Sequence, residues 1–196
     1  MTEPAAEFEP FLNLVRHWHT GHPRTDQVQH CQRVWDWLRQ ALDREPAPVP
    51  ARRELLLAAL GHDLYEDSAI PRAQVATEYG ADVDRLIEAV TERDGVAEFV
   101  ERVAGGSEGA RLVKLADGID NYDSLVRTGL LRADPAKWAD VVRKQMEPMF
   151  SRIGGMPFHQ YPTAGRWLAE QLDRHRERFW AELTSTLRGL APASET

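Results

Sequence analysis

Apolar side chains recur at three- and four-residue spacing along almost the whole chain, and this spacing is typical of amphipathic helices. Residues 54–62 are apolar nearly all round, which predicts a central helix buried on every side. No alternating pattern of strand length is present. The pattern predicts an all-α protein, with helices over about 8–18, 26–42, 54–62, 71–79, 82–92, 96–104, 110–128, 134–150 and 163–187.

Capping and breaking residues separate these segments. Thr25 or Asp26 can cap the second helix. The prolines of residues 45–50 predict a loop, because proline lacks a donor and disfavours helix before itself. Asp134-Pro135 combines an N-cap with proline at the first helical position, and the Gly-Gly-Met-Pro stretch at 154–157 ends that helix.

The length of 196 residues and the mass of 22.2 kDa correspond to one domain with a single core. We expect one helical domain over residues 1–190. Its metal-binding core would cover about 22–128, and C-terminal helices would follow at about 134–190. We expect the last residues, 191–196, to form a disordered tail.

Charge and cysteine content narrow the classes of partner. The 24 basic and 31 acidic residues give a net charge of −7, which argues against nucleic-acid binding but not against a phosphorylated small molecule. No apolar run has the length of a signal peptide or a membrane span. The single cysteine, Cys31, permits no internal disulfide. We therefore expect a cytoplasmic protein without a nucleic-acid or membrane partner.

Four residues that can bind a metal are spread over three predicted helical segments: His30, the adjacent His62 and Asp63, and Asp117. Two imidazoles and two carboxylates can form the shell of one divalent cation. A buried helix that ends in His-Asp delivers two of these ligands to one point. A lone histidine beside an apolar stripe is more often a packing residue, and a lone His-Asp pair occurs by chance. The ordered set of four is what predicts a metal site.

Charged and amide side chains accompany the candidate ligands at helical spacing. Glu66 and Asp67 follow the His-Asp pair closely, and on a continuing helix they would lie beside the ligand face. Taken alone, they are typical of a solvated acidic turn. Lys114 and Asn121 stand three residues before and four after Asp117, so the three share one helix face. From its position, Lys114 could neutralise charge on a bound phosphate.

Three further histidines, His17, His19 and His22, lie close together in the sequence. They straddle the predicted end of the first helix and the turn after it, which argues against a second metal site. We interpret them as residues near a substrate entrance.

The surroundings of the candidate ligands resemble a known family. Residues 58–92, AALGHDLYEDSAIPRAQVATEYGADVDRLIEAVTE, are similar to the HDxxED region of the RelA/SpoT-type alarmone hydrolase domains. Residues 111–125, RLVKLADGIDNYDSL, follow at the expected distance and are similar to the KLADRxHN signature. The resemblance covers about residues 22–125. It implies the all-α HD-domain helical bundle of the small single-domain alarmone hydrolases.

The resemblance implies a chemistry and a role for each matching residue. In this family the metal is usually Mn²⁺, and the reaction removes pyrophosphate from the 3′ position of guanosine tetra- or pentaphosphate. The matches are the metal ligands His30, His62, Asp63 and Asp117, the catalytic acidic pair Glu66 and Asp67, and Asn121 near the nucleotide. The chain departs from the family at Gly118 and Asp120, where the signature has arginine and histidine. It also has Gln29-His30-Cys31 where the family has His-Pro.

Three other functions stay open from the sequence. A nucleoside 5′-monophosphatase or a broader nucleotide phosphohydrolase could use the same ligands. An oxygenase with two irons needs further histidines between the His-Asp pair and the last aspartate, and residues 64–116 contain none. A module that senses a nucleotide without cleaving it is a third possibility, although the presence of Glu66 and Asp67 argues against it.

Overall fold

The computed structural model describes residues 4–23 and 26–190, and the regular elements within these ranges are all helices. The predicted all-α class is confirmed. Two earlier expectations, the cap at Thr25 and the tail at residues 191–196, lie outside the described residues.

The helices share the boundaries that the apolar pattern predicts to within a few residues. In chain order the elements are η1 (Ala6–Phe8), α1 (Glu9–Trp18), α2 (Gln27–Leu42), α3 (Arg52–Gly61), α4 (Leu64–Asp67), α5 (Arg72–Tyr79), α6 (Ala81–Val90), α7 (Val96–Gly105), α8 (Glu108–Arg127), α9 (Leu130–Ala133), α10 (Pro135–Val141), η2 (Val142–Met146), α11 (Glu147–Ile153) and α12 (Pro162–Leu190).

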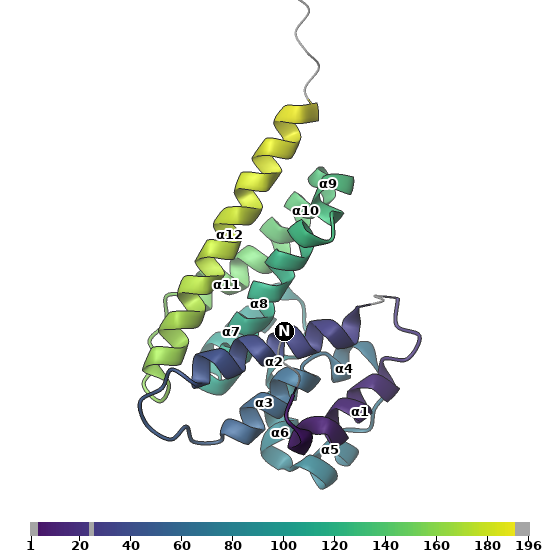
Figure 1. The fold of residues 1–196 in the computed structure, drawn as a ribbon, viewed down its shortest axis with the longest axis vertical. Coiled ribbons are helices and arrows are strands. Elements are labelled where there is room, and N and C mark those ends of the chain that lie inside the picture. The colour runs from purple at the N-terminus through teal and green to yellow at the C-terminus, as the bar shows by residue number, and fades with distance from the viewer. Residues whose placement is uncertain (1–3, 24–25, 191–196) are drawn as a thin grey trace, which may run out of the picture.

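Two helices, α3 and α8, form the centre of the molecule (Figure 1). Every residue of α3 from Leu55 to Gly61 is buried, as its all-round apolar sequence predicts. The longer α8 packs against α2, α3, α6 and α12, and it is buried over most of its length. The Ser107 side chain caps α8 by accepting a hydrogen bond from the backbone N–H of Ala110. The polar residues of α8 are thereby enclosed by other helices.

The segment predicted as one helix over 134–150 is interrupted. Asp134 caps α10 as expected, by accepting from the backbone N–H of Lys137 at 3.0 Å. A π-helical turn, η2, then separates α10 from α11. Pro148 lies two residues after this turn and has no N–H for the helical ladder, so a widened turn before it accommodates the missing bond. The short α9 was not predicted, because its four residues are too few for a periodic signal.

Among the described residues, the helices are all too short or too polar to span a bilayer.

Candidate metal centre

The four predicted ligands come together although they lie on separate segments. His30 is on α2, His62 and Asp63 lie between α3 and α4, and Asp117 is in the middle of α8. The Nε2 atoms of His30 and His62 are 3.1 Å apart. The Oδ1 atom of Asp117 is 3.3 Å from the first of these nitrogens and 3.5 Å from the second. These three side chains are buried and could hold a metal ion.

Asp63 lies at the break between two helices and is the fourth member of the cluster, which consists of His30, His62, Asp63 and Asp117. Its Oδ1 atom lies 3.0 Å from His62 Nε2, and its Oδ2 atom lies 3.5 Å from His30 Nε2. The helix ends at the His-Asp pair as predicted, since α3 ends at Gly61 and α4 begins at Leu64, so Glu66 and Asp67 are not on a continuation of α3. The turn between them allows adjacent residues to face one point.

Hydrogen bonds fix the orientation of both imidazoles. His62 Nδ1 is 2.9 Å from the backbone carbonyl of Ala59, so Nδ1 donates the proton there. His30 Nδ1 is 2.7 Å from an Asp120 carboxylate oxygen and donates in the same way. In the neutral form of each imidazole, Nε2 therefore carries the lone pair, and the two Nε2 atoms converge. A carboxylate or carbonyl behind each imidazole is the usual support of a metal-binding histidine, so the residues fit a cation.

Asp120 contacts the candidate site, and we did not predict this contact from the sequence. It is 1 % exposed, and its second oxygen accepts from Arg33 Nε at 2.6 Å. Arg33 in turn donates to Asp26 at 3.0 Å. Burial alone would raise the pKa of Asp120, but the hydrogen bonds from His30 and Arg33 lower it to about 2. A charged carboxylate thus stands behind His30. Asp120 stands three residues after Asp117 on the same helix, and this spacing could have identified it as a residue of the same face.

Opposite charges balance each other inside the cluster. Burial would lower the pKa of both imidazoles, but the surrounding carboxylates outweigh burial, so the pKa of His30 is raised and that of His62 is raised well above the ordinary value. Burial would likewise raise the pKa of the two aspartates, yet the imidazoles beside Asp63 and chiefly Lys114 beside Asp117 lower them. A divalent cation can replace the protons that these imidazoles otherwise hold.

Two side chains on α8 bind Asp117 directly. Lys114 Nζ donates to Asp117 Oδ2 at 2.6 Å, and Asn121 Nδ2 donates to Oδ1 at 2.7 Å. The helical spacing predicted that the three would share a face. Lys114 is itself half-buried, and the carboxylates around it raise its pKa against the effect of burial. It therefore keeps a positive charge next to the cluster.

The acidic pair of α4 lies at the rim of the cluster. Glu66 accepts a hydrogen bond from the backbone N–H of Glu92, and burial of its carboxylate raises its pKa, although Lys114 opposes this. Burial also raises the pKa of Asp67, and the Asp63 carboxylate adds to the shift. Both groups can therefore exchange a proton closer to neutral pH than an ordinary carboxyl group.

Gln27 links Asp67 at the rim to Asp63 in the cluster. Nothing in the sequence indicated this contact. Its side-chain amide donates to Asp63 and, at 3.1 Å, to Asp67. Both acceptors are thereby held in place by one buried residue of α2. An amide at the first position of a helix has no characteristic spacing, so only the tertiary fold identifies it.

The three N-terminal histidines lie on this side of the molecule but differ from one another. His22 Nε2 is 3.4 Å from an Asp67 oxygen, and the His19 ring is 5.9 Å from the His22 ring. His19 is buried and bonds the Val15 carbonyl through Nδ1, whereas His17 is exposed. Within the described residues they do not bring three ligand atoms together as the main cluster does.

Gly118, one of the departures from the family signature, has a packing reason. A Cβ atom at this position would lie 2.3 Å from the ring of Phe150. The ring of α11 therefore occupies the space that a side chain would need. Cys31, beside His30, is fully buried, and its sulfur lies close enough to His62 and Asp63 to be a further candidate ligand atom.

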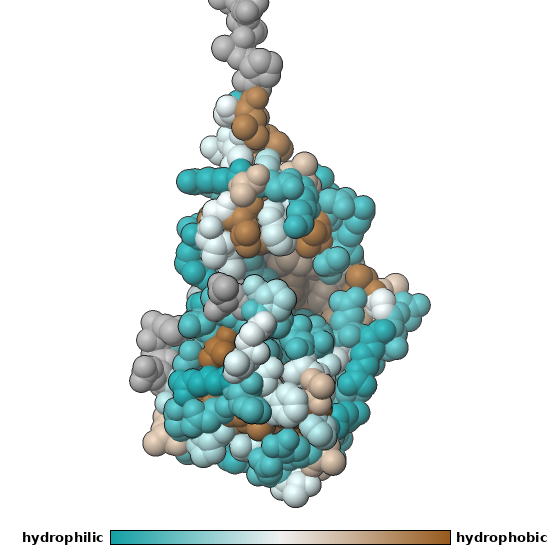
Figure 2. Space-filling view, turned by 90° about the vertical axis from the view of Figure 1, so that its right-hand side faces the viewer, coloured by the Kyte–Doolittle hydropathy of each residue, from teal (hydrophilic) through white to brown (hydrophobic). Residues whose placement is uncertain are grey.

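A cavity of about 730 Å³ lies next to the cluster. It reaches from Asn121, which binds Asp117, to Trp138 and Lys137 on α10, and Asp26 lies on the opposite wall. Figure 2 shows this face of the molecule hollowed in its middle, with apolar side chains in the recess. The cavity combines an aromatic side chain, a cation and the amide that donates to Asp117.

Comparison with known proteins finds relatives by sequence and by fold. No protein-family model matches the chain. Guanosine-3′,5′-bis(diphosphate) 3′-pyrophosphohydrolase MESH1 from Mus musculus and from Homo sapiens is 36 % identical over 92 residues, which is 44 % of this chain and 49 % of each relative. The match thus spans about half the length of these relatives. A solved structure of a metazoan ortholog of SpoT that hydrolyses ppGpp superimposes with a TM-score of 0.63 at 26 % identity, covering 91 % of this chain and 98 % of the other.

Proposed function

We propose that this chain, an HD-type relative of the MESH1 pyrophosphohydrolases by sequence and fold, is a metal-dependent hydrolase that removes pyrophosphate from the 3′ position of guanosine 3′,5′-bis(diphosphate). The observation that carries the proposal is the convergence of His30, His62, Asp63 and Asp117 on one point. The named activity of the relatives supplies the substrate.

The four converging residues would hold one divalent cation, and Mn²⁺ is our choice. Their imidazole nitrogens and carboxylate oxygens suit a borderline to hard divalent ion. When bound, such an ion supplies positive charge to the phosphate and lowers the pKa of a water. Asp120 and the Ala59 carbonyl hold the two imidazoles in the tautomer that leaves Nε2 free.

The rim residues Glu66 and Asp67 would transfer a proton and position the attacking water. Glu66 has a raised pKa and lies near Lys114, so it can accept a proton from the attacking water and pass it to the leaving oxygen. Asp67, which accepts a hydrogen bond from Gln27, would hold the attacking water in position beside Glu66. Lys114 stays charged and would offset negative charge on the pyrophosphoryl group as water attacks its phosphorus and the bond to the ribose 3′ oxygen breaks.

The neighbouring cavity would take the nucleoside. A purine can stack on Trp138, while Asn121 lies where the nucleotide meets the metal cluster. Lys137 on the same wall offers a cation to the 5′-diphosphate. The partner is thus a small nucleotide. The net charge of −7 argues against nucleic acid, and the single cysteine fits a cytoplasmic location.

A substrate panel tests the proposal. Purified protein, supplied with Mn²⁺ after chelation, should consume guanosine 3′,5′-bis(diphosphate), whereas the His62→Ala, Asp63→Ala double variant should lose both bound metal and activity. The matched control is Asp36→Asn, which alters a carboxylate on α2 that pairs with Arg39 and is not a proposed ligand. Consumption of nucleoside monophosphates with the bis(diphosphate) untouched would favour the nucleotidase instead. Binding of the nucleotide without turnover would favour a sensing module.

A further inference from the structure

One carboxylate lies in the wall of the large cavity that would take the nucleoside. Asp26, at the start of α2, lines this cavity together with Lys137 and Trp138 of α10. Among the described residues that line it, Asp26 is the only one with a carboxylate. A carboxylate repels phosphate groups and can only accept hydrogen bonds, so it suits a neutral part of a nucleotide that carries donors.

The Asp26 carboxylate is oriented by Arg33 rather than by its own helix. Asp26 is the N-cap residue of α2, yet its side chain makes no capping hydrogen bond, although aspartate often caps at this position. Its Oδ2 atom accepts from Arg33 Nη2 at 3.0 Å, about two helical turns further along α2. The Asp26 side chain is 35 % exposed. A carboxylate has about four acceptor positions, so Asp26 can bind a ligand while it stays paired with Arg33.

Arg33 is itself held by the carboxylate that supports the metal cluster. Arg33 Nε donates to Asp120 Oδ1 at 2.6 Å, and Arg33 Nη2 donates to Asp120 Oδ2 at 3.1 Å. Asp120 in turn accepts from the candidate metal ligand His30. Two hydrogen bonds to a buried carboxylate fix the plane of the guanidinium group. Asp26 is therefore a negatively charged acceptor whose position is set before a ligand arrives.

The proposed substrate leaves its base for this carboxylate. The 3′-diphosphate would lie at the metal cluster, and Lys137 offers a cation to the 5′-diphosphate. Asn121 lines the cavity and donates to Asp117, so the ribose would lie near this amide, between the two diphosphates. The base is the remaining part, and it is neutral.

Guanine has the donors that a carboxylate needs. Its N1–H and its 2-amino group lie side by side on the Watson–Crick edge, and one carboxylate can accept from both. Adenine has a lone pair in place of the N1–H, and xanthine has a carbonyl in place of the 2-amino group. Either base would turn an acceptor toward Asp26 and leave its charge without a donor, which costs more than one lost hydrogen bond.

We propose that Asp26 determines the base specificity of this chain by accepting from the N1–H and the 2-amino group of guanine while the base stacks on Trp138. The inference rests on the proposed function for the place of the nucleotide. The contact itself needs no hydrolysis, so it can be tested separately from the reaction.

Binding of nucleoside 5′-diphosphates to the Mn²⁺-loaded protein, measured by calorimetry, tests this contact. These ligands lack the 3′-diphosphate that the proposed reaction removes. We expect guanosine diphosphate to bind about 10- to 30-fold more tightly than adenosine or xanthosine diphosphate, with inosine diphosphate between them, since the site is partly exposed. Asp26→Asn should weaken binding of guanosine diphosphate by a similar factor. It should strengthen binding of xanthosine diphosphate, because the new amide can donate to the carbonyl of xanthine.

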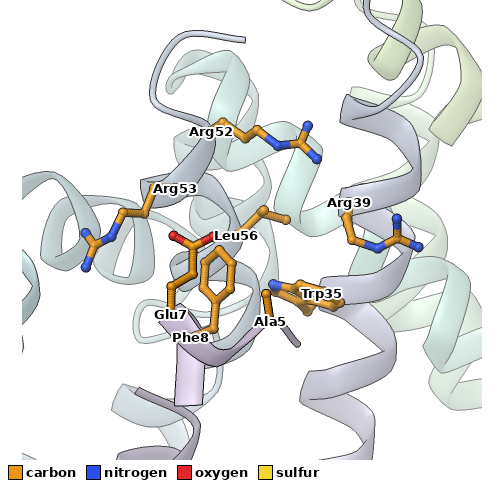
Figure 3. A pocket seen from close by; sticks show the side chains of 8 residues that line it. All are labelled: Ala5, Glu7, Phe8, Trp35, Arg39, Arg52, Arg53 and Leu56. Carbon is orange, nitrogen blue, oxygen red and sulfur yellow. The ribbon is translucent and has the colours of Figure 1, made fainter. Parts of the chain in front are cut away.

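The matched control is Asp36→Asn, which removes a carboxylate from the same helix. Asp36 pairs with Arg39, which lines a separate cavity of about 440 Å³ (Figure 3). This variant should leave the order of the four affinities unchanged. In Asp26→Asn, Arg33 keeps both bonds to Asp120, so that variant should fold as the parent protein does.

The inference is overturned if the parent protein binds guanosine and adenosine diphosphate alike, or if Asp26→Asn leaves the order of affinities unchanged. It is also overturned if Asp26→Asn has no effect on binding of 2′-deoxyguanosine diphosphate, since Asp26 would then bind the ribose. Pyrophosphate release alongside any of these results would leave the proposed function standing. Guanine selectivity that depends on Asp26, without pyrophosphate release, would support this inference and defeat the proposed function.

Discussion

Replacing Asp120 with asparagine keeps the shape of the side chain but removes the negative charge behind His30. In the native protein, Asp120 accepts from His30 Nδ1 at 2.7 Å and from Arg33 Nε at 2.6 Å, and it is 1 % exposed. The asparagine can accept through one oxygen only, so its NH₂ group must face either the imidazole or the guanidinium. The His30 imidazole should therefore be held less firmly, and its basicity should fall.

Two magnitudes follow from this geometry. Loss of the carboxylate behind a metal-binding histidine lowers metal affinity by about 10- to 100-fold, which is roughly 1.4–2.8 kcal/mol. Removal of one member of a buried ion pair costs about 3–5 kcal/mol of stability. Arg33 keeps its bond to Asp26 and is 19 % exposed, so we expect about 2–3 kcal/mol here.

Metal affinity is measured by competition with a chelating dye, and the free energy of unfolding by urea titration with chelator present. The control is Asp36→Asn, on the same helix as His30, which removes a partner of Arg39 without touching an imidazole. It should cost less than about 1 kcal/mol and leave metal affinity unchanged. If Asp120→Asn loses stability but binds metal within about twofold of the parent protein, then Asp120 supports only the fold and the reasoning is refuted.

Three more predictions follow from the same geometry. Glu66→Gln should leave metal content unchanged and lower turnover by about 10²–10⁴-fold. Since its pKa is raised, the acid limb of kcat/KM in the parent protein should lie above the ordinary pKa of glutamate and disappear in the variant, and an unchanged pH profile would count against a proton-transfer role. Metal affinity should fall as the pH falls, beginning above pH 6.5 because the pKa of each imidazole in the cluster is raised, and affinity independent of pH would contradict their assignment as ligands. Gly118→Ala should lower the free energy of unfolding by about 1–3 kcal/mol because its Cβ meets the Phe150 ring, whereas Gly155→Ala, with open space around it, should not.

The sequence predicted the fold where periodicity was strong. The all-apolar run identified α3 as a central helix, and cap residues placed the start of α10. It did not predict the burial of α8, whose polar residues are enclosed only because α2, α3, α6 and α12 surround it. The π-helical turn before Pro148 was also missed, since proline marks a disturbance but not the form that it takes.

The candidate site divides in the same way. Residue types and their order identified the four candidate ligands that the fold brings together, and helical spacing identified Lys114 and Asn121 as neighbours of Asp117. Gln27 binds across 36 residues to Asp63, and Arg33 reaches across 87 residues to Asp120. Such contacts depend on how helices pack, and no local pattern in one sequence encodes them. The roles of all these residues in binding and catalysis stay predictions.

The central claim is that the bond broken is the one that releases pyrophosphate from the 3′ side of guanosine 3′,5′-bis(diphosphate). Ion-exchange chromatography of a reaction with Mn²⁺ measures this directly, because it separates nucleotide products and distinguishes pyrophosphate from orthophosphate. We expect guanosine diphosphate and pyrophosphate in equal amounts, with no product from the Asp63→Ala variant. Release of orthophosphate, or no reaction by a protein that binds its metal, would contradict it.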